Sequence, residues 1–141
     1  MHLSKRLQRV ADNVLSGGVV ADIGCDHGFT SIYLIRHKKV TKAIAMDINE
    51  GPLERAKEHM LSYGVEEHME LRLSDGLQML DADEADTLLI SGMGGALICQ
   101  ILEAKEEVTK SAKELVLSPQ SEIFLVRKCL HGMGFCIAHE E

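Results

Sequence analysis

A turn rich in glycine and acidic residues, at positions 19–28, constrains the fold of this chain more than any other feature. It reads Val-Val-Ala-Asp-Ile-Gly-Cys-Asp-His-Gly, an apolar run that breaks into glycines and leads into a second apolar pattern. This order is typical of the strand, turn and helix of a nucleotide-binding α/β domain, in which small residues let a ligand approach the backbone. The stretch therefore predicts an α/β fold with a nucleotide site at the end of its first strand.

The residues inside the turn indicate which nucleotide it accepts. A dinucleotide fingerprint has glycines at its first, third and sixth positions, so that free amides and a helix N-terminus receive a pyrophosphate. Here Cys25 and Asp26 stand between two glycines, and Asp22 lies just upstream. Two carboxylates repel a diphosphate but attract a ligand with an ammonium and a sulfonium group, which favours S-adenosylmethionine. A glycine turn without a ligand stays an alternative, and an NAD-dependent oxidoreductase is a distant one.

Length and composition fit one globular domain spanning residues 1–141. A chain of this size with 45% hydrophobic and 26% charged residues is ordinary for a soluble protein with a packed core. No stretch approaches the roughly 18 apolar residues of a membrane span, and the start lacks the apolar region of a signal peptide. We therefore expect a cytoplasmic protein and take a monomer as the default.

Charge and cysteine content narrow the function further. The net charge is −7, which argues against broad non-specific binding of nucleic acid but leaves room for a local basic face. The four cysteines form no Cys-x-x-Cys pair, and the seven histidines have no ligand-like spacing. We expect reduced thiols and no bound metal.

The chain opens with the pattern of an amphipathic helix. Apolar residues recur at helical spacing, at Leu3, Leu7, Val10 and Val14. Three cations lie on roughly the opposite face, namely Lys5, Arg6 and Arg9. They form either an ordinary solvated surface or, if the ligand is RNA, a patch that contacts phosphates.

Acidic residues follow the next two strands, which we expect over residues 43–46 and 69–73. Asp47 closes the first of these strands about 20 residues beyond the glycine turn, where such folds bind ribose hydroxyls. Asp75 and Gly76 follow the other strand, where a carboxylate can accept a hydrogen bond from the adenine amine. The alternatives are a strand-end acid beside a helix N-terminus for Asp47 and a plain Asp-Gly turn for the second pair.

A second unusual site, Gly92-Met93-Gly94-Gly95, follows an expected buried strand over residues 87–91. Three glycines in four positions cost chain entropy unless the backbone must come close to another group. We expect that group to be the substrate base and the reactive methyl. Tight packing without a ligand is the alternative.

The remaining pattern predicts a doubly wound, mostly parallel sheet of the Rossmann-like kind. Helices are expected over residues 29–35, from Gly51-Pro52 to Gly64, from residue 97 onward and over 123–130. A fifth strand is expected over 115–117, with Ser118-Pro119-Gln120 as its polar exit, and a sixth over 135–138. The aromatic residues mostly occupy apolar positions, which indicates core packing for Phe29, Tyr33, Phe124 and Phe135.

With these motifs assembled, the chain resembles the class I S-adenosylmethionine-dependent methyltransferases, and within them the bacterial TrmK family of tRNA (adenine(22)-N1)-methyltransferases. The resemblance covers nearly the whole chain. It rests on Leu3-Ser4-Lys5-Arg6-Leu7, Ala21-Asp22-Ile23-Gly24-Cys25-Asp26-His27, Gly51-Pro52, Asp75-Gly76, Gly92-Met93-Gly94-Gly95 and Leu117-Ser118-Pro119-Gln120. The first glycine loop is common to many methyltransferases, whereas its Asp-His continuation combined with Gly-Met-Gly-Gly is much more specific.

The resemblance implies a cofactor, a partner and a site. The residues implied to hold S-adenosyl-L-methionine are Asp22, Gly24, Cys25, Asp26, Asp47, Asp75, Gly76 and Gly92. Gly92 and Met93 would line the junction between the methyl group and the target base, and the partner would be tRNA. The family continues with a further strand and a helical C-terminal region, which we expect to be absent from this chain.

The chemistry of methylation at adenine N1 assigns further roles. A ring lone pair attacks the sulfonium carbon and the product ring becomes cationic, so alignment and electrostatic support matter more than a strong base. Asp26 is the candidate for that support, and His27 either orients the base or caps the following helix. These two residues, with Gly92 and Met93, are the predicted catalytic set. The predicted RNA contacts are phosphate contacts from Lys5, Arg6 and Arg9.

Two other functions stay open at this stage. One is an S-adenosylmethionine-dependent enzyme acting on another RNA or a small molecule. The other is a domain that binds the cofactor but transfers nothing because the C-terminal region is missing.

Overall fold

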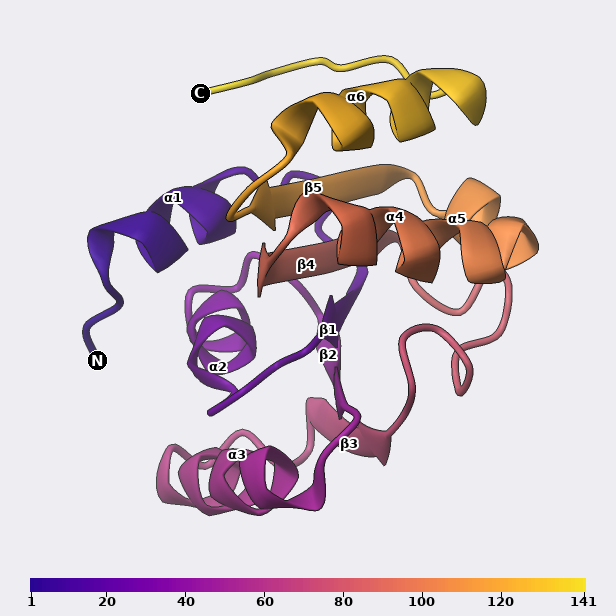
Figure 1. Cartoon of the computed structure of the whole chain (residues 1–141). Helices are drawn as coiled ribbons and strands as arrows, with labels where there is room; N and C mark the ends of the chain where they lie inside the picture. Colours follow the sequence, from indigo (N-terminus) through magenta and orange to yellow (C-terminus); the bar gives the residue numbers. More distant parts are fainter.

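Five strands form the centre of the structure, a computed structural model that describes residues 1–141. The strands are β1 (Val19–Ile23), β2 (Lys42–Asp47), β3 (Met69–Leu73), β4 (Thr87–Met93) and β5 (Glu114–Pro119). They pair in the order β3-β2-β1-β4-β5, and every neighbouring pair is parallel (Figure 1). The chain thus builds one half of the sheet outward from β1 and then returns to build the other half. The predicted doubly wound parallel sheet is confirmed.

Helices cover both faces of this sheet, as parallel strands require. They are α1 (Lys5–Asp12), α2 (Phe29–Arg36), α3 (Glu50–Ser62), α4 (Gly95–Ala104), α5 (Glu106–Ser111) and α6 (Ile123–Gly132). On one face, α1 and α3 contribute Val10 and Ala56 to a buried cluster. On the other face, α4 and α6 contribute Ile98 and Val126 to a second cluster. The two sets of helices stand on opposite sides of the strands in Figure 1.

The central strand β1 shows why this sheet is stable and where it is specialised. Val20 packs into the first cluster, whereas Ala21 and Ile23 pack into the second. Burying each valine or isoleucine side chain contributes about 1.5–3 kcal/mol. Asp22 breaks this apolar run, yet only 4% of its surface is exposed. A buried acid at the carboxyl end of a central strand stabilises the core poorly, so its place indicates a binding role.

The strand order reverses between β1 and β4, which places a crevice at their carboxyl ends. Ile23 is in register with Met46 of β2 on one side and with Ile90 of β4 on the other. Three strands therefore end at the same edge of the sheet. In doubly wound folds, ligands bind at this topological switch point.

The C-terminal segment differs from the sequence-based prediction, because residues 135–138 form no strand. The amide of Phe135 donates to the carbonyl of Leu130 at 2.9 Å, and Gly134 has a φ of +84°, so the chain turns back at the end of α6. Arg127 then holds Glu140 through a 2.8 Å hydrogen bond. The segment lies along α6 instead of pairing with β5 (Figure 1). The expected sixth strand is therefore wrong, and β5 is the edge of the sheet.

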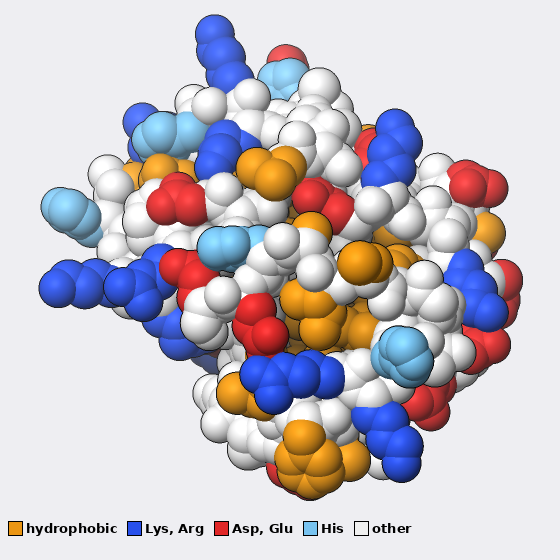
Figure 2. All heavy atoms as spheres, turned by 90° about the horizontal axis from the view of Figure 1, so that it is seen from above, with side chains coloured by type: hydrophobic (Ala, Val, Ile, Leu, Met, Phe, Trp, Pro, Cys, Tyr) orange, Lys and Arg blue, Asp and Glu red, His pale blue; other side chains and the backbone are white.

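The surface on the side of α6 carries charges of both signs. Figure 2 shows acidic, basic and histidine side chains interspersed there with hydrophobic ones, without one continuous basic field. Nothing on this face contradicts the overall acidic balance of the chain. None of the helices has the length and apolar character that a membrane crossing requires.

Candidate active site

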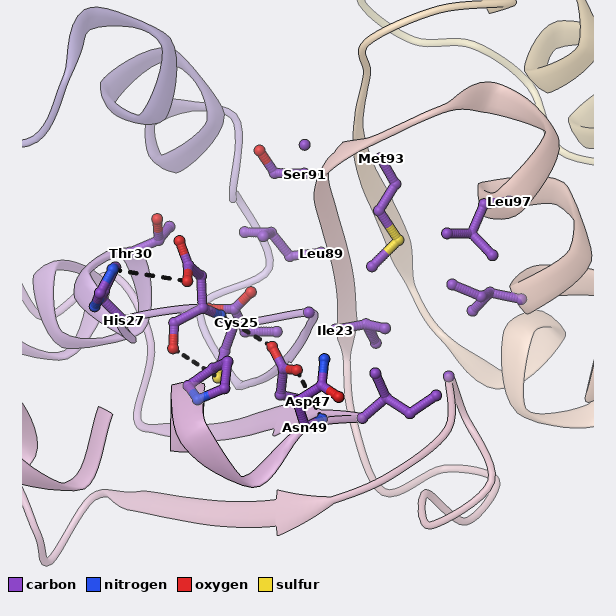
Figure 3. A pocket seen from close by; sticks show the side chains of 18 of the residues that line it. Ile23, Cys25, His27, Thr30, Asp47, Asn49, Leu89, Ser91, Met93 and Leu97 are labelled. Carbon is purple, nitrogen blue, oxygen red and sulfur yellow. Dashed lines mark hydrogen bonds and ion pairs between the residues drawn. The ribbon is translucent and has the colours of Figure 1, made fainter. Parts of the chain in front are cut away.

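A cavity of about 550 Å³ opens at the carboxyl ends of β1, β2 and β4. This volume suits a small-molecule ligand. Cys25 and Asp47 lie on one side of it, and Met93 and Leu97 lie on the other (Figure 3). The predicted site residues in its wall are Arg6, Asp22, Gly24, Cys25, Asp26, His27, Asp47, Asp75, Gly76, Gly92 and Met93. Predicted residues from five segments of the sequence thus converge on one cavity.

Asp22 is the most deeply buried acid of the site. Its Oδ2 accepts a 2.8 Å hydrogen bond from the Ser31 hydroxyl at the start of α2. The pKa of Asp22 is raised from 3.8 to about 6, chiefly by burial. The hydrogen bond from Ser31 opposes this rise, and the neighbouring carboxylates of Asp47 and Asp26 contribute to it. A cationic ligand group in the cavity would relieve this repulsion. The wall therefore favours a ligand that brings positive charge.

The turn after β1 depends on two backbone conformations that favour glycine. Gly24 has a φ of +72°, and a Cβ there would lie 2.5 Å from the Met93 methyl carbon. Gly28 has a φ of +77°, and a Cβ there would lie 3.0 Å from the Ala56 Cβ. Because side chains are excluded at both positions, the turn stays close to β4 and α3. Asp26, with a φ of +52°, is held between them in the same left-handed region.

Cys25 contributes packing and backbone contacts rather than a reactive thiol. Its amide donates to the Met46 carbonyl at 2.9 Å, beside the matching 2.8 Å bond from Gly24. The side chain is buried, and burial raises the pKa of the thiol well above its usual range. The thiolate needed for nucleophilic chemistry is therefore disfavoured. Cys25 shapes the cavity wall as a small apolar residue.

Asp47 ends β2 and braces the turn. Its Oδ2 accepts from the amide of Asp26 at 3.3 Å, and its Oδ1 accepts from the amide of Asn49 at 3.0 Å. A carboxylate has about four acceptor positions, so each oxygen can accept another hydrogen bond from a ligand. This geometry fits the predicted ribose contact.

Asp75 and Gly76 form the far end of the cavity. Gly76 has a φ of +59°, and a Cβ there would lie 3.3 Å from the side chain of Ile101. The Ser74 hydroxyl donates to the Gly76 carbonyl at 2.9 Å, which fixes this turn. The exposed Asp75 carboxylate lies beside an apolar wall of Leu97 and Ile101. The carboxylate can bind the polar edge of a heterocycle, and the apolar wall can pack against its flat face.

The glycines of the second motif have different roles. Gly92 lies inside β4, with a φ of +83°, at a register shift opposite β5, and it faces the cavity. Gly95 is buried in α4, where a Cβ would collide with the backbone carbonyl of Glu122. The ligand hypothesis therefore fits Gly92, whereas tight packing explains Gly95.

His27 belongs to an aromatic cluster at the mouth of the cavity. Its ring stacks against Phe29 at 6.0 Å between centroids, and Phe29 stacks on His59 at 4.2 Å. His59 Nδ1 lies 2.8 Å from the His27 carbonyl, which fixes the loop from α3. The N-cap of α2 is Gly28, without a side-chain hydrogen bond, so the interpretation of His27 as a helix cap is wrong.

Core packing was also the wrong prediction for two aromatic residues. Phe29 lies in the cavity wall, and Phe124 on α6 is 65% exposed. The sequence places both at apolar positions, but one faces the ligand crevice and the other faces solvent. A flat aromatic surface beside Asp26 is therefore available at the cavity mouth.

The three predicted RNA-binding cations have different surroundings. Arg6 reaches the cavity, where its Nη1 donates to the Ser91 hydroxyl at 2.7 Å. Lys5 and Arg9 are exposed on α1 and lie outside the cavity wall. The α1 helix is positioned by Ser4, whose hydroxyl caps it by accepting from the Leu7 amide at 3.2 Å. Sequence reasoning did not predict that Arg6 lines the cavity and bonds to Ser91.

Among the wall residues that sequence reasoning left without a role are the polar residues Asn49, Ser91 and Gln120. Gln120 follows directly from the Leu-Ser-Pro stretch of β5, and this motif was the only signal that could have found it. No group of three or more histidine, cysteine or acidic residues is arranged to hold a metal ion.

The fold and the cavity define a class I methyltransferase architecture, in which an acidic glycine turn at the switch point replaces the pyrophosphate cradle of a dehydrogenase. Comparison with known proteins agrees. The model of the methyltransferase domain family matches residues 3–141. The chain belongs to this family.

Individual relatives within this family are tRNA methyltransferases. The tRNA (adenine(22)-N(1))-methyltransferase of Bacillus subtilis is 38% identical over 99% of this chain, and the crystal structure of that organism's M1A22 tRNA methyltransferase TrmK superposes with a TM-score of 0.91. Another solved TrmK, from M. capricolum in complex with S-adenosyl-homocysteine, is 28% identical and covers 100% of this chain with a TM-score of 0.90. The resemblance to TrmK proteins is thus confirmed.

The match is to a part of each relative. This chain spans 59% of the Bacillus subtilis protein and 62% of the solved M. capricolum chain. The domain is therefore shared with these proteins.

Proposed function

We propose that this chain transfers a methyl group from S-adenosyl-L-methionine to N1 of an adenine in tRNA, at position 22, in the cytoplasm. One observation supports this most directly. The cavity joins an acidic wall of Asp22, Asp26 and Asp47 to a polar rim of Arg6 and Ser91, across the bare backbone of Gly92. The acidic wall suits a cationic cofactor, and the rim lies where an incoming base can approach.

The cofactor fits the residues of the cavity. S-adenosylmethionine supplies an electrophilic methyl group on a sulfonium centre. Asp47 would hold the ribose hydroxyls, and Asp75 with Gly76 would hold the adenine edge against Ile101. Asp22 would face the positive charge, which explains why a buried acid occupies this strand end. The solved relatives that contain S-adenosyl-homocysteine or S-adenosyl-L-methionine support the choice of cofactor.

The chain's own contribution to the reaction is positioning and electrostatic support. Asp26 is exposed at the cavity mouth, with its backbone fixed by the hydrogen bond to Asp47. A carboxylate there stabilises the positive charge that the adenine ring gains on methylation. Gly92 and Met93 leave room for the target base beside the methyl group. His27 and Phe29 offer a flat surface on which an unstacked nucleotide can rest.

The substrate follows from the relatives rather than from the cavity. The 38% identical Bacillus subtilis protein is a tRNA (adenine(22)-N(1))-methyltransferase, and the solved Bacillus subtilis TrmK is an M1A22 tRNA methyltransferase. Lys5 and Arg9 on the exposed side of α1 would contact tRNA phosphates. The α1 helix and the cavity rim are the RNA-contacting surfaces that we propose for this domain.

The experiment uses the 141-residue chain, S-adenosylmethionine with a labelled methyl group, and unmodified tRNA. After incubation, the tRNA is digested to nucleosides and the label is identified. Label in 1-methyladenosine supports the proposal. Label in another nucleoside indicates a different RNA target, and tight cofactor binding without any transfer indicates a binding domain. An Asp26→Asn variant that keeps full turnover would remove Asp26 from the chemistry.

A further inference from the structure

Gln120 lies at the junction of the cavity with the proposed target site, and nothing in the chain uses its side-chain amide. Its backbone amide donates to the Met93 carbonyl at 2.8 Å, which fixes the residue against the end of β4. Its Nε2 lies 3.8 Å from the point where a Cβ on Gly92 would stand. The side chain is exposed and forms no hydrogen bond within the protein. An unpartnered amide is therefore held beside the bare backbone of Gly92.

The proposed reaction restricts how adenine can be recognised at this place. The N1 lone pair must point at the methyl group, so the Watson–Crick edge of the base faces the cofactor and its N1 accepts no hydrogen bond from the protein. The Hoogsteen edge, with the N6 amine as donor and N7 as acceptor, stays free for recognition. Glutamine and asparagine pair with this edge through two hydrogen bonds, one accepted and one donated.

The other polar groups near Gly92 cannot make this pair. Arg6 Nη1 lies 4.0 Å from the same Cβ point, but a guanidinium only donates and this one is bonded to Ser91. Asp26 only accepts when ionised. Asn49 is the other amide in the wall, and it lies next to Asp47 at the proposed ribose end. The Ser91 hydroxyl already accepts from Arg6, and its single oxygen cannot span both N6 and N7 of a base. Gln120 is thus the amide at the target end that has both a free donor and a free acceptor atom.

We propose that Gln120 is the residue that selects adenine, with its Oε1 accepting from N6 and its Nε2 donating to N7 of the target base. This inference rests on the proposed function. Guanine presents two acceptors, O6 and N7, on the same edge, so it leaves the Gln120 oxygen without a donor. The Leu-Ser-Pro-Gln stretch of β5 thereby gains a role in substrate choice.

The test compares unmodified tRNA with tRNA carrying 7-deazaadenine at position 22, which lacks the N7 acceptor and keeps N1 and N6. We expect kcat/KM of the wild-type chain to fall about tenfold on the 7-deaza substrate, since each such contact contributes a sizeable part of base discrimination. Gln120→Ala should lose at least as much on unmodified tRNA and show no further loss on the 7-deaza substrate. Gln100→Ala, an exposed glutamine on α4 outside the cavity, should behave as the wild type.

The outcomes separate this inference from the proposed function. Equal 7-deaza penalties in the wild type and in Gln120→Ala, or no penalty in the wild type, overturn the role of Gln120 while leaving methylation of tRNA in place. No methylation of unmodified tRNA by the wild type overturns the proposed function and the inference with it. Cofactor affinity and thermal unfolding of Gln120→Ala should match the wild type, because its side chain has no partner in the fold.

Discussion

Arg6 and Ser91 are 85 positions apart in the sequence, yet a 2.7 Å hydrogen bond joins the guanidinium of one to the hydroxyl of the other. This bond ties the first helix to the end of β4, beside Gly92. The N-terminal helix is therefore a wall of the cavity as well as a cover of the sheet. The three cations of α1 consequently have two different surroundings.

Because Arg6 lines the cavity whereas Lys5 and Arg9 do not, replacing them should have different kinetic effects. Arg6→Ala removes the bond to Ser91 and opens the target end, so we expect kcat to fall at least about tenfold, the scale of one hydrogen bond to a charged group. Cofactor affinity should stay within about twofold. The measurement is steady-state methyl transfer to tRNA together with calorimetric cofactor binding.

The double variant Lys5→Ala/Arg9→Ala is the counterpart. It should weaken tRNA binding and reduce the slope of log Kd against log salt by about one for each lost phosphate contact, while kcat at saturating tRNA stays unchanged. The idea that α1 carries two functions is wrong if Arg6→Ala changes only the salt slope or if the double variant changes only kcat.

Asp47 is predicted to dominate cofactor affinity. In Asp47→Asn the side-chain oxygen can still accept one backbone amide, but the charged acceptor for ribose hydroxyls is lost. Hydrogen bonds to charged groups contribute about 1.5–3 kcal/mol, so the Kd for S-adenosylmethionine should rise roughly 10- to 100-fold. Calorimetry measures this, with Asp81→Asn in an exposed turn as the matched control. An unchanged Kd in Asp47→Asn would leave this residue with a structural role only.

Asp22 makes stability depend on pH in an unusual direction. Its pKa is about 6 in the folded protein against 3.8 as the reference value, so between these pH values the folded state binds more protons than the unfolded state. Ionisation of Asp22 thus lowers the free energy of unfolding as pH rises from about 4 to about 7, by up to about 3 kcal/mol. Asp22→Asn keeps an acceptor for Ser31 but does not ionise.

Urea unfolding of both proteins at several pH values checks this. The stability of Asp22→Asn relative to the wild type should increase over the same interval and stay constant above it. Comparing the two proteins cancels the pH dependence of stability that comes from the other acids. Glu84 is one of these acids: hydrogen bonds from Arg72 lower its pKa to about 2, so its ionised form stabilises the fold at pH values above the ordinary pKa of a glutamate. A difference that is independent of pH would contradict the burial of an ionisable Asp22.

Two glycines with similar backbones predict different costs of substitution. Gly28 and Gly64 have φ values of +77° and +66°, so an alanine is strained by about 1–2 kcal/mol at either position. A Cβ on Gly28 would also press on the Ala56 Cβ at 3.0 Å, whereas nothing lies within 4 Å of a Cβ on Gly64. Gly28→Ala should therefore lose at least about 1 kcal/mol more than Gly64→Ala in urea unfolding. Equal losses of unfolding free energy in the two variants would show that the packing between Gly28 and α3 adjusts to a methyl group at little cost.

The fold and most of the cavity wall could be predicted from the sequence because strand-end glycines and acids mark the switch point of a parallel sheet. Asp47 and Asp75 end or follow strands that meet at one edge, so their positions followed from pattern alone. The strand predicted over 135–138 failed because an apolar run after α6 resembles a strand, whereas local hydrogen bonds such as Phe135 to Leu130 decide its path.

The rest of the site depends on long-range contacts that no local pattern contains. His59 reaches the His27 carbonyl from 32 positions away, and Arg6 crosses to Ser91 from another layer of the fold. A helical pattern shows that Arg6 is on the polar side of α1 but not what lies opposite it. Gln120 was visible as part of a motif, and its place beside Gly92 emerged only when β4 and β5 paired.

The most direct test of the central claim is to locate the methyl group on the tRNA. Wild-type chain and S-adenosylmethionine are incubated with two transcripts, one with adenine at position 22 and one with guanine there, and reverse transcription then reports where a methyl group blocks base pairing. The account predicts a stop at position 22 of the adenine transcript and none in the guanine transcript. A stop at another position in both transcripts, or no stop with cofactor bound, would contradict it.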